Sequence, residues 1–204
     1  DFSEGEFSNQ TSFFVSRFKG EVPKFYQRKM HQDTTFSLKR SNWPDVTIAN
    51  SVSDKDAYTR LRVIMNELQK PDDEHFFFRQ EMRNKAITED PIDRFSINFY
   101  GLVSDFGFSV TRPVLLLAGV VSLGWGVMGT YLKNHTETAH PIAAGLGLSV
   151  ANTFPFLGFI RRFHGDVYTE APNWIEVIAG TQSILGVILL FFLGLGLRNR
   201  FRLK

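Results

Sequence analysis

Three long stretches without a charged residue dominate the second half of the chain. They cover residues 113–132, 138–160 and 177–197, and each is near the ~20 residues that an α-helix needs to cross a bilayer. The first and last are dense in Leu, Val and Ile, whereas the middle one carries small residues, polar residues and a helix-breaking proline. We therefore predict two membrane spans at about 113–132 and 177–197, and a re-entrant segment or a third span at about 141–160.

The middle stretch ends in a polar and aromatic motif that suits the tip of a re-entrant element. These candidate re-entrant or pore residues are Asn152, Thr153, Phe154, Pro155 and Phe156. Two spans around such an element resemble the layout of tetrameric channel subunits, although the sequence lacks the Thr-Val-Gly-Tyr-Gly filter of potassium channels.

Small residues recur at every fourth position in two of the uncharged stretches. One set is Ala118, Ser122, Gly126 and Thr130, and the other is Ala143, Gly147 and Ala151. Small side chains let two helix backbones approach closely, so both sets are candidate helix-packing residues, within one subunit or between subunits. The alternative is that membrane helices are simply rich in small residues.

Large apolar residues at the start of the chain come in pairs five residues apart, and the pairs recur every eleven or twelve residues. The set is Phe2, Phe7, Phe13, Phe18, Phe25, Met30 and Phe36. Neither a 3.6-residue helix nor a period-2 strand generates this spacing, whereas a coil of short straight runs and tight corners does. The alternative is an irregular loop rich in Phe.

This N-terminal run resembles the end of the solenoid in bacterial pentapeptide-repeat proteins, in the Phe-centred variant of their pattern. The resemblance covers about residues 1–37 and lacks the stricter Ala-Asp/Asn-Leu form of the repeat. The Tyr-Gly…Arg-Pro junction at 100–113, the Asn-Thr-Phe-Pro-Phe segment and the tail at 197–202 resemble a membrane-embedded C-terminal region of uncharacterised family members. The resemblance implies a right-handed β-solenoid, whose core would be the Phe set, and a role in protein contacts.

The middle of the chain reads as helical. Residues 54–69 place Ala57, Leu61, Ile64 and Leu68 on one stripe, and Pro71 starts a second helix running to about residue 86. We predict a helical hairpin that caps the solenoid. The domain boundaries are then 1–52 for the solenoid and exit loop, 53–90 for the hairpin, 91–112 for an amphipathic helix and 113–204 for the membrane domain.

The segment 91–112 has one apolar face. The face is made by Phe95, Phe99, Leu102, Val103, Phe106 and Val110. We predict a helix lying in the membrane interface just before the first span. The alternative is an amphipathic helix packed on the soluble half.

The distribution of charged residues predicts on which side of a membrane the two ends of the chain lie. The sequence carries 23 basic and 21 acidic residues, a formal net charge of +2 that is too small to favour nucleic acid as a partner. With two spans, the N-terminal half and the basic tail Arg198, Arg200, Arg202 and Lys204 share one side. The positive-inside rule makes that side cytoplasmic. Together with the family resemblance, this predicts the bacterial inner membrane.

Motifs for catalysis, metals or cofactors are missing from the sequence. There is no cysteine, and the five histidines form no HExxH pair. The residues 124–129 match G-x-G-x-x-G but lie inside an apolar run with no strand before it. We expect no enzyme activity and no cofactor.

The predicted fold is mixed: a β-solenoid, a helical hairpin and an α-helical transmembrane region. The predicted function is a membrane-anchored repeat protein acting as an interaction or scaffold subunit, with a bilayer and either copies of itself or a membrane-complex protein as partners. An oligomeric channel-like subunit is the alternative.

Overall fold

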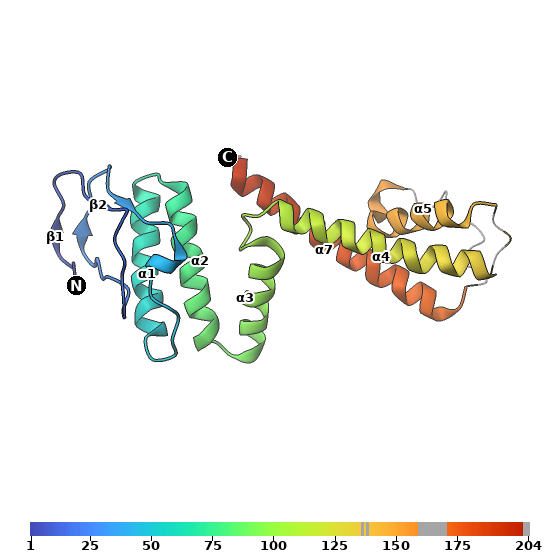
Figure 1. The fold of residues 1–204 in the computed structure, drawn as a ribbon, viewed down its shortest axis with the longest axis horizontal. Helices are drawn as coiled ribbons and strands as arrows, with labels where there is room; N and C mark the ends of the chain where they lie inside the picture. The colour runs from blue at the N-terminus through green and yellow to red at the C-terminus, as the bar shows by residue number, and fades with distance from the viewer. Residues whose placement is uncertain (136, 138, 159–170, 202–204) are drawn as a thin grey trace. The chain divides into compact units, whose positions relative to one another are not determined.

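The chain is helical and forms two compact units. The computed structural model describes residues 1–135, 137, 139–158 and 171–201, and it is 65% helical. One unit covers residues 1–100 and the other residues 101–204. Within the described residues, helices α1 to α5 and α7 and four short strands make up the fold (Figure 1).

The predicted right-handed β-solenoid over residues 1–37 is wrong. The described strands have two residues each: β1 (Gly5–Glu6), β2 (Ser12–Phe13), β3 (Arg28–Lys29) and β4 (Thr35–Phe36). They form two separate two-stranded parallel sheets, β1 with β3 and β2 with β4. Single backbone hydrogen bonds flank the β1–β3 pair, from the N–H groups of Phe2, Glu4 and Phe7 to the carbonyls of Lys24, Tyr26 and Lys29, but regular strand pairing covers only two residues in each sheet.

The aromatic side chains of this segment nevertheless pack together. Phe2 stacks on Phe25 with ring centres 5.3 Å apart, and Phe13 stacks on Phe36 at 5.1 Å. Phe36 then meets the ring of Phe77 from α2 at 5.6 Å. The segment is therefore an aromatic layer that lies on helices, which complete the core.

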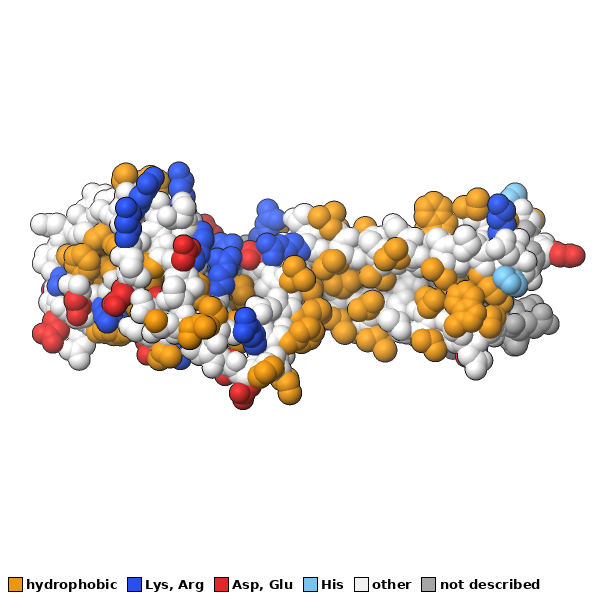
Figure 2. Space-filling model, turned by 60° about the horizontal axis from the view of Figure 1, so that its bottom comes forward, with side chains coloured by type: hydrophobic (Ala, Val, Ile, Leu, Met, Phe, Trp, Pro, Cys, Tyr) orange, Lys and Arg blue, Asp and Glu red, His pale blue; other side chains and the backbone are white. Residues whose placement is uncertain are grey.

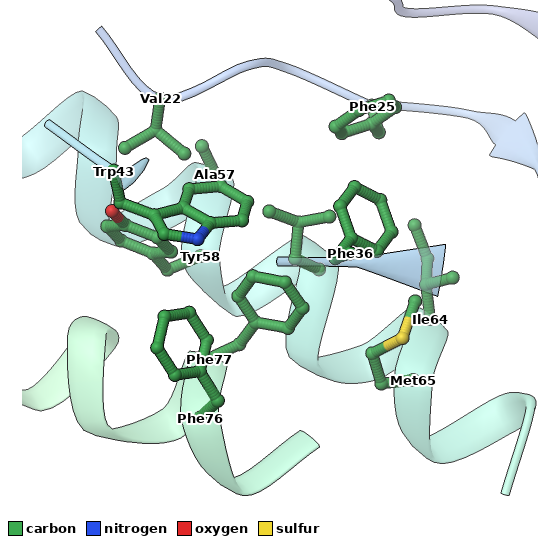
Figure 3. Packing of buried hydrophobic residues seen from close by; sticks show 11 residues of the cluster. Val22, Phe25, Phe36, Trp43, Ala57, Tyr58, Ile64, Met65, Phe76 and Phe77 are labelled. Atoms are coloured by element: carbon green, nitrogen blue, oxygen red, sulfur yellow. The ribbon is translucent and has the colours of Figure 1, made fainter. Parts of the chain in front are cut away.

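Two adjacent helices supply the other side of this core. They are α1 (Ser51–Glu67) and α2 (Pro71–Thr88), and the 3₁₀ turn η1 (Arg40–Asn42) precedes them. Trp43 lies between Tyr58 of α1 and Phe77 of α2, with ring centres 5.7 and 5.2 Å away (Figure 3). Helix α3 (Pro91–Ser104) follows α2. The aromatic cluster holds the first unit together; its buried members are Val22, Phe25, Phe36, Trp43, Ala57, Tyr58, Leu61, Ile64, Met65, Phe76 and Phe77.

Two long helices run in opposite directions through the second unit. Helix α4 covers Thr111–His135 and α7 covers Asn173–Phe201. Tyr131, near the end of α4, contacts Trp174 at the start of α7 with ring centres 6.0 Å apart. At the opposite end, the Asn199 side chain of α7 donates a hydrogen bond of 2.8 Å to the carbonyl of Gly107, just before α4. The beginning of α4 and the end of α7 thus lie at the same end of this unit.

A third, shorter helix covers only part of their length. Helix α5 (Pro141–Thr153) starts beside the end of α4, where Trp125 Nε1 donates to the carbonyl of Ile142 at 2.8 Å. It finishes beside the middle of α7, where the Thr153 carbonyl lies against Gly186. The turn η2 (Pro155–Leu157) follows. Thirteen residues extend about 20 Å at 1.5 Å per residue, which is less than the ~30 Å hydrocarbon thickness.

Candidate functional site

A cluster of polar side chains is buried where α4, α5 and α7 meet. Its centre is Gln182 of α7, which is 4% exposed. The Gln182 amide nitrogen lies 2.6 Å from Ser149 Oγ and 2.9 Å from Thr153 Oγ1, both of α5. Ser149 Oγ in turn donates to the carbonyl of Val121 in α4 at 2.7 Å. One side chain thus links the three helices through hydrogen bonds.

A neighbouring bond extends the cluster along α5. Ser183 Oγ donates to the carbonyl of Asn152 at 2.8 Å, which gives an acceptor near the end of α5 a partner. Gln182 Oε1 is buried and has no hydrogen-bond partner among the described residues. Because a helix interface in lipid gains nothing from the hydrophobic effect, hydrogen bonds of this kind and close packing hold it together.

Glycines make room for this cluster. A Cβ on Gly124 of α4 would overlap the Gln182 amide and lie 2.6 Å from Ser149 Oγ. A Cβ on Gly145 of α5 would lie 2.6 Å from the Cα of Gly129. Neither these contact glycines nor Gln182 belongs to the packing residues predicted from the sequence. The signal was present, because a glutamine inside an otherwise apolar stretch marks a buried polar contact.

The first predicted set of helix-packing residues faces away from the other helices. Ala118, Ser122, Gly126 and Thr130 are all exposed, and a Cβ on Gly126 would have no described atom within 4 Å. Within one chain this face of α4 therefore packs against nothing that the structure describes. A contact between subunits through it stays a prediction.

The second predicted set spreads from surface to core. Ala143 is exposed, Gly147 is half-buried and Ala151 is fully buried. The set lies on α5, while α4 turns other residues toward it, so the structure does not bring the two predicted sets together.

The predicted re-entrant motif lies at the end of α5. Asn152 and Thr153 are buried, Phe154 and Pro155 are half-buried, and Phe156 is exposed. The last two residues of the predicted segment 141–160 lie outside the described residues.

The predicted solenoid-core residues belong to the aromatic layer of the first unit. Phe25 and Phe36 are buried. Four others pack against the cluster while remaining half-buried, and these are Phe7, Phe13, Phe18 and Met30. Phe2 is 39% exposed although its ring stacks on Phe25.

The first unit also carries a hollow on its surface. Its volume is about 690 Å³, and its lining includes the exposed apolar side chains Phe14, Val15 and Leu38. Arg17 and Lys39 lie in the same lining. The lining also holds one carboxylate, that of Asp73, so two cations and one anion lie beside the exposed apolar side chains. This excess of positive charge matches an apolar segment that carries a carboxylate.

Comparison with protein families, curated proteins and solved structures finds no match to this chain. Among the residues that the structure describes, no group of three or more metal-ligating side chains comes together. The expectations of no enzyme activity and no cofactor stay predictions.

Proposed function

We propose that this chain is a membrane-anchored interaction subunit. Residues 101–204 hold it in a bilayer through α4 and α7, and residues 1–100 contact another protein. The resemblance-based expectation of a bacterial inner membrane, with the first unit and the C-terminal tail in the cytoplasm, completes the proposal.

One observation carries the anchoring. Helices α4 and α7 are long and apolar enough to cross a bilayer, yet only 28% and 22% of their most apolar windows are buried. The apolar core helix of a soluble protein is mostly buried, whereas these helices expose Leu115, Leu123, Ile184 and Phe191 by more than 60% each. On the face in Figure 2, hydrophobic side chains spread along this unit and charged ones gather toward its ends. A bilayer is the environment that covers such a surface without cost.

Orientation is tested with single cysteines, because the natural chain has none. Asp56→Cys, at an exposed position of α1, and Arg200→Cys should both resist a membrane-impermeant maleimide in intact cells and react once the cells are broken open. Glu137→Cys, at the opposite end of α4, should react. If Arg200→Cys and Glu137→Cys both react in intact cells while Asp56→Cys does not, α5 belongs to a full third span and the proposed topology is wrong.

The hollow of the first unit is the proposed contact surface, and its occupant is an acidic, apolar segment of a partner protein. The matched variants are Phe14→Glu in the hollow and Ile48→Glu, which is 82% exposed and does not line the hollow. Native mass spectrometry of particles extracted from the source membrane should show this chain with a second polypeptide. That complex should be lost with Phe14→Glu and kept with Ile48→Glu. Equal loss or equal retention contradicts the assignment.

A channel-like oligomer is the second candidate. The observation in its favour is that α5 ends halfway along α4 and α7, with polar Ser149, Thr153 and Gln182 at that level. These groups bond to each other and to backbone carbonyls, which favours cohesion over conduction. A particle mass equal to a ring of identical chains would favour the channel instead.

A further inference from the structure

Helix α3 exposes a continuous apolar face. Ile92, Phe95 and Leu102 are 80%, 70% and 72% exposed, and Phe99 lies between the last two. These positions follow the three- and four-residue steps that put side chains on one side of a helix. The rings of Phe95 and Phe99 stack with centres 6.1 Å apart, so the side chains form one surface.

The rest of α3 is polar enough to prefer water. Asp93 and Arg94 are exposed and lie off the apolar face. With 14 residues, α3 is about 21 Å long and carries two charges, so it cannot cross a bilayer. A short helix with one apolar and one charged side suits the boundary between lipid and water.

The last turn of α3 is fixed at one end of the second unit. The Arg112 guanidinium, one residue into α4, donates to the carbonyls of Gly101 at 2.8 Å and Leu102 at 3.4 Å. Val103 is buried with Leu117 of α4 and Leu189 of α7. Leu102 therefore lies beside the end of the unit at which α4 begins and α7 finishes.

That end of the unit is basic. Arg112, Arg198 and Arg200 are all exposed there, and the guanidinium fork matches the phosphate of a phospholipid headgroup. If α4 and α7 cross a bilayer, these arginines lie at headgroup depth, and so does the last turn of α3. Lipid is then the apolar phase nearest to the exposed face.

We propose that α3 lies in the headgroup region of the bilayer, with Ile92, Phe95, Phe99 and Leu102 among the upper acyl chains. This inference rests on the proposed membrane anchoring. It assigns α3, within which the boundary between the two units lies, to the lipid surface.

The test uses a fluorescent label on single cysteines in the full-length chain. Phe95→Cys and Leu102→Cys report the apolar face, and Asp93→Cys reports the polar side of the same helix. Each variant is labelled with an environment-sensitive nitrobenzoxadiazole dye and reconstituted into phosphatidylcholine vesicles containing some phosphatidylglycerol. Lipids with a doxyl group near the headgroup serve as the quencher.

The dye at Phe95→Cys and Leu102→Cys should be quenched several-fold by the doxyl lipid and shielded from aqueous iodide. The dye at Asp93→Cys should be quenched by aqueous iodide and little affected by the doxyl lipid. A blue-shifted dye that neither lipid nor iodide quenches would mean that protein covers the face, either the first unit or a second copy, and would overturn the inference. Iodide quenching at all three positions would overturn it as well.

A fourth label separates this inference from membrane anchoring. Ile184 lies near the middle of α7 and is 63% exposed, so a dye at Ile184→Cys should be quenched by lipids carrying the doxyl group deep in the acyl chain. If it is quenched while the α3 labels are not, anchoring holds and the interfacial assignment is wrong. If it is not quenched, the proposed anchoring itself is wrong.

Discussion

Replacing Gly124 by alanine should destabilise the second unit, whereas the same change at Gly126 should not. A Cβ at Gly124 would overlap the Gln182 amide, but one at Gly126 meets nothing described within 4 Å. Overpacking a filled interface costs about 1–3 kcal/mol. Both variants gain the same helix propensity, about 1 kcal/mol for alanine over glycine, so the difference between them isolates the contact.

The Gly124→Ala variant loses more stability if the added methyl group displaces the Gln182 side chain. Gln182 then gives up its bonds to Ser149 and Thr153, and a buried polar group without a partner costs about 1–3 kcal/mol. We therefore expect the free energy of unfolding of Gly124→Ala to be about 1–3 kcal/mol lower than that of Gly126→Ala, and lower still if Gln182 is displaced. In the Gln182→Ala background, Gly124→Ala should cost less, because the clash with Gln182 is gone and only the contact of 2.6 Å with Ser149 Oγ remains.

The assay is unfolding in mixed micelles by titration with sodium dodecyl sulfate. A cysteine at Ala151, which is fully buried in α5, gives one thiol whose reactivity reports opening of the second unit alone. Equal stability of Gly124→Ala and Gly126→Ala would refute the described packing of α4 on α5 and α7. A shift in particle mass with Gly126→Leu, but not with Leu116→Ile, would instead reveal a contact between subunits on the exposed face.

Two further predictions concern the first unit, and hydrogen exchange of α1 amides checks both. Phe13→Ala should cost about 3 kcal/mol, the low end for phenylalanine because the ring is half-buried, while Phe14→Ala, 65% exposed, should cost little; equal costs would argue against the aromatic layer. Burial raises the pKa of the Asp54 carboxyl, and the hydrogen bond from the Val22 N–H at 3.1 Å only partly opposes this. The folded state therefore holds the Asp54 proton more tightly than the unfolded state, and stability falls as pH rises from the unfolded pKa through the raised one. Asp54→Asn should then be more stable than the natural chain above this window and equal to it below; exposed Asp56→Asn is the control, and a pH-independent difference would contradict the reasoning.

The long helices of the second unit could be predicted because their signal is local. Uncharged stretches at 113–132 and 177–197 lie inside α4 and α7, which continue over polar residues at both ends. Helix α5 stops at Thr153, just before Phe154 and Pro155, as a proline near the end of the run predicts. Length and composition are enough for such elements.

The packing of these helices could not be predicted from the spacing of small residues. Helix α4 contains Gly119, Gly124, Gly126 and Gly129 on different sides. The side that faces its neighbours contains Gly124, which leaves space for Gln182, a residue of another helix and far along the chain. A spacing rule applied to α4 alone has no access to that partner.

A run of three phenylalanines shows the same limit in α2. Phe76 and Phe77 are buried in the aromatic cluster, whereas the adjacent Phe78 is half-buried. Periodicity cannot choose among adjacent apolar residues. In the N-terminal segment, likewise, the five-residue spacing identifies rings that gather but not the amount of strand pairing between them.

The burial of Gln182 weighs against a water path through one subunit. Its Oε1 is sealed from solvent, and its nitrogen is engaged with hydroxyls of α5. Opening the cluster to water would break the bonds from Gln182 to α5, which are of the kind that holds helices together in lipid if this unit crosses a bilayer. Any pore would therefore have to form between subunits, on a face of α4 or α7 that is exposed in one chain. The face of Ala118, Ser122 and Gly126 is exposed in this way. The particle-mass experiment on Gly126→Leu therefore tests both the channel and the contact between small residues.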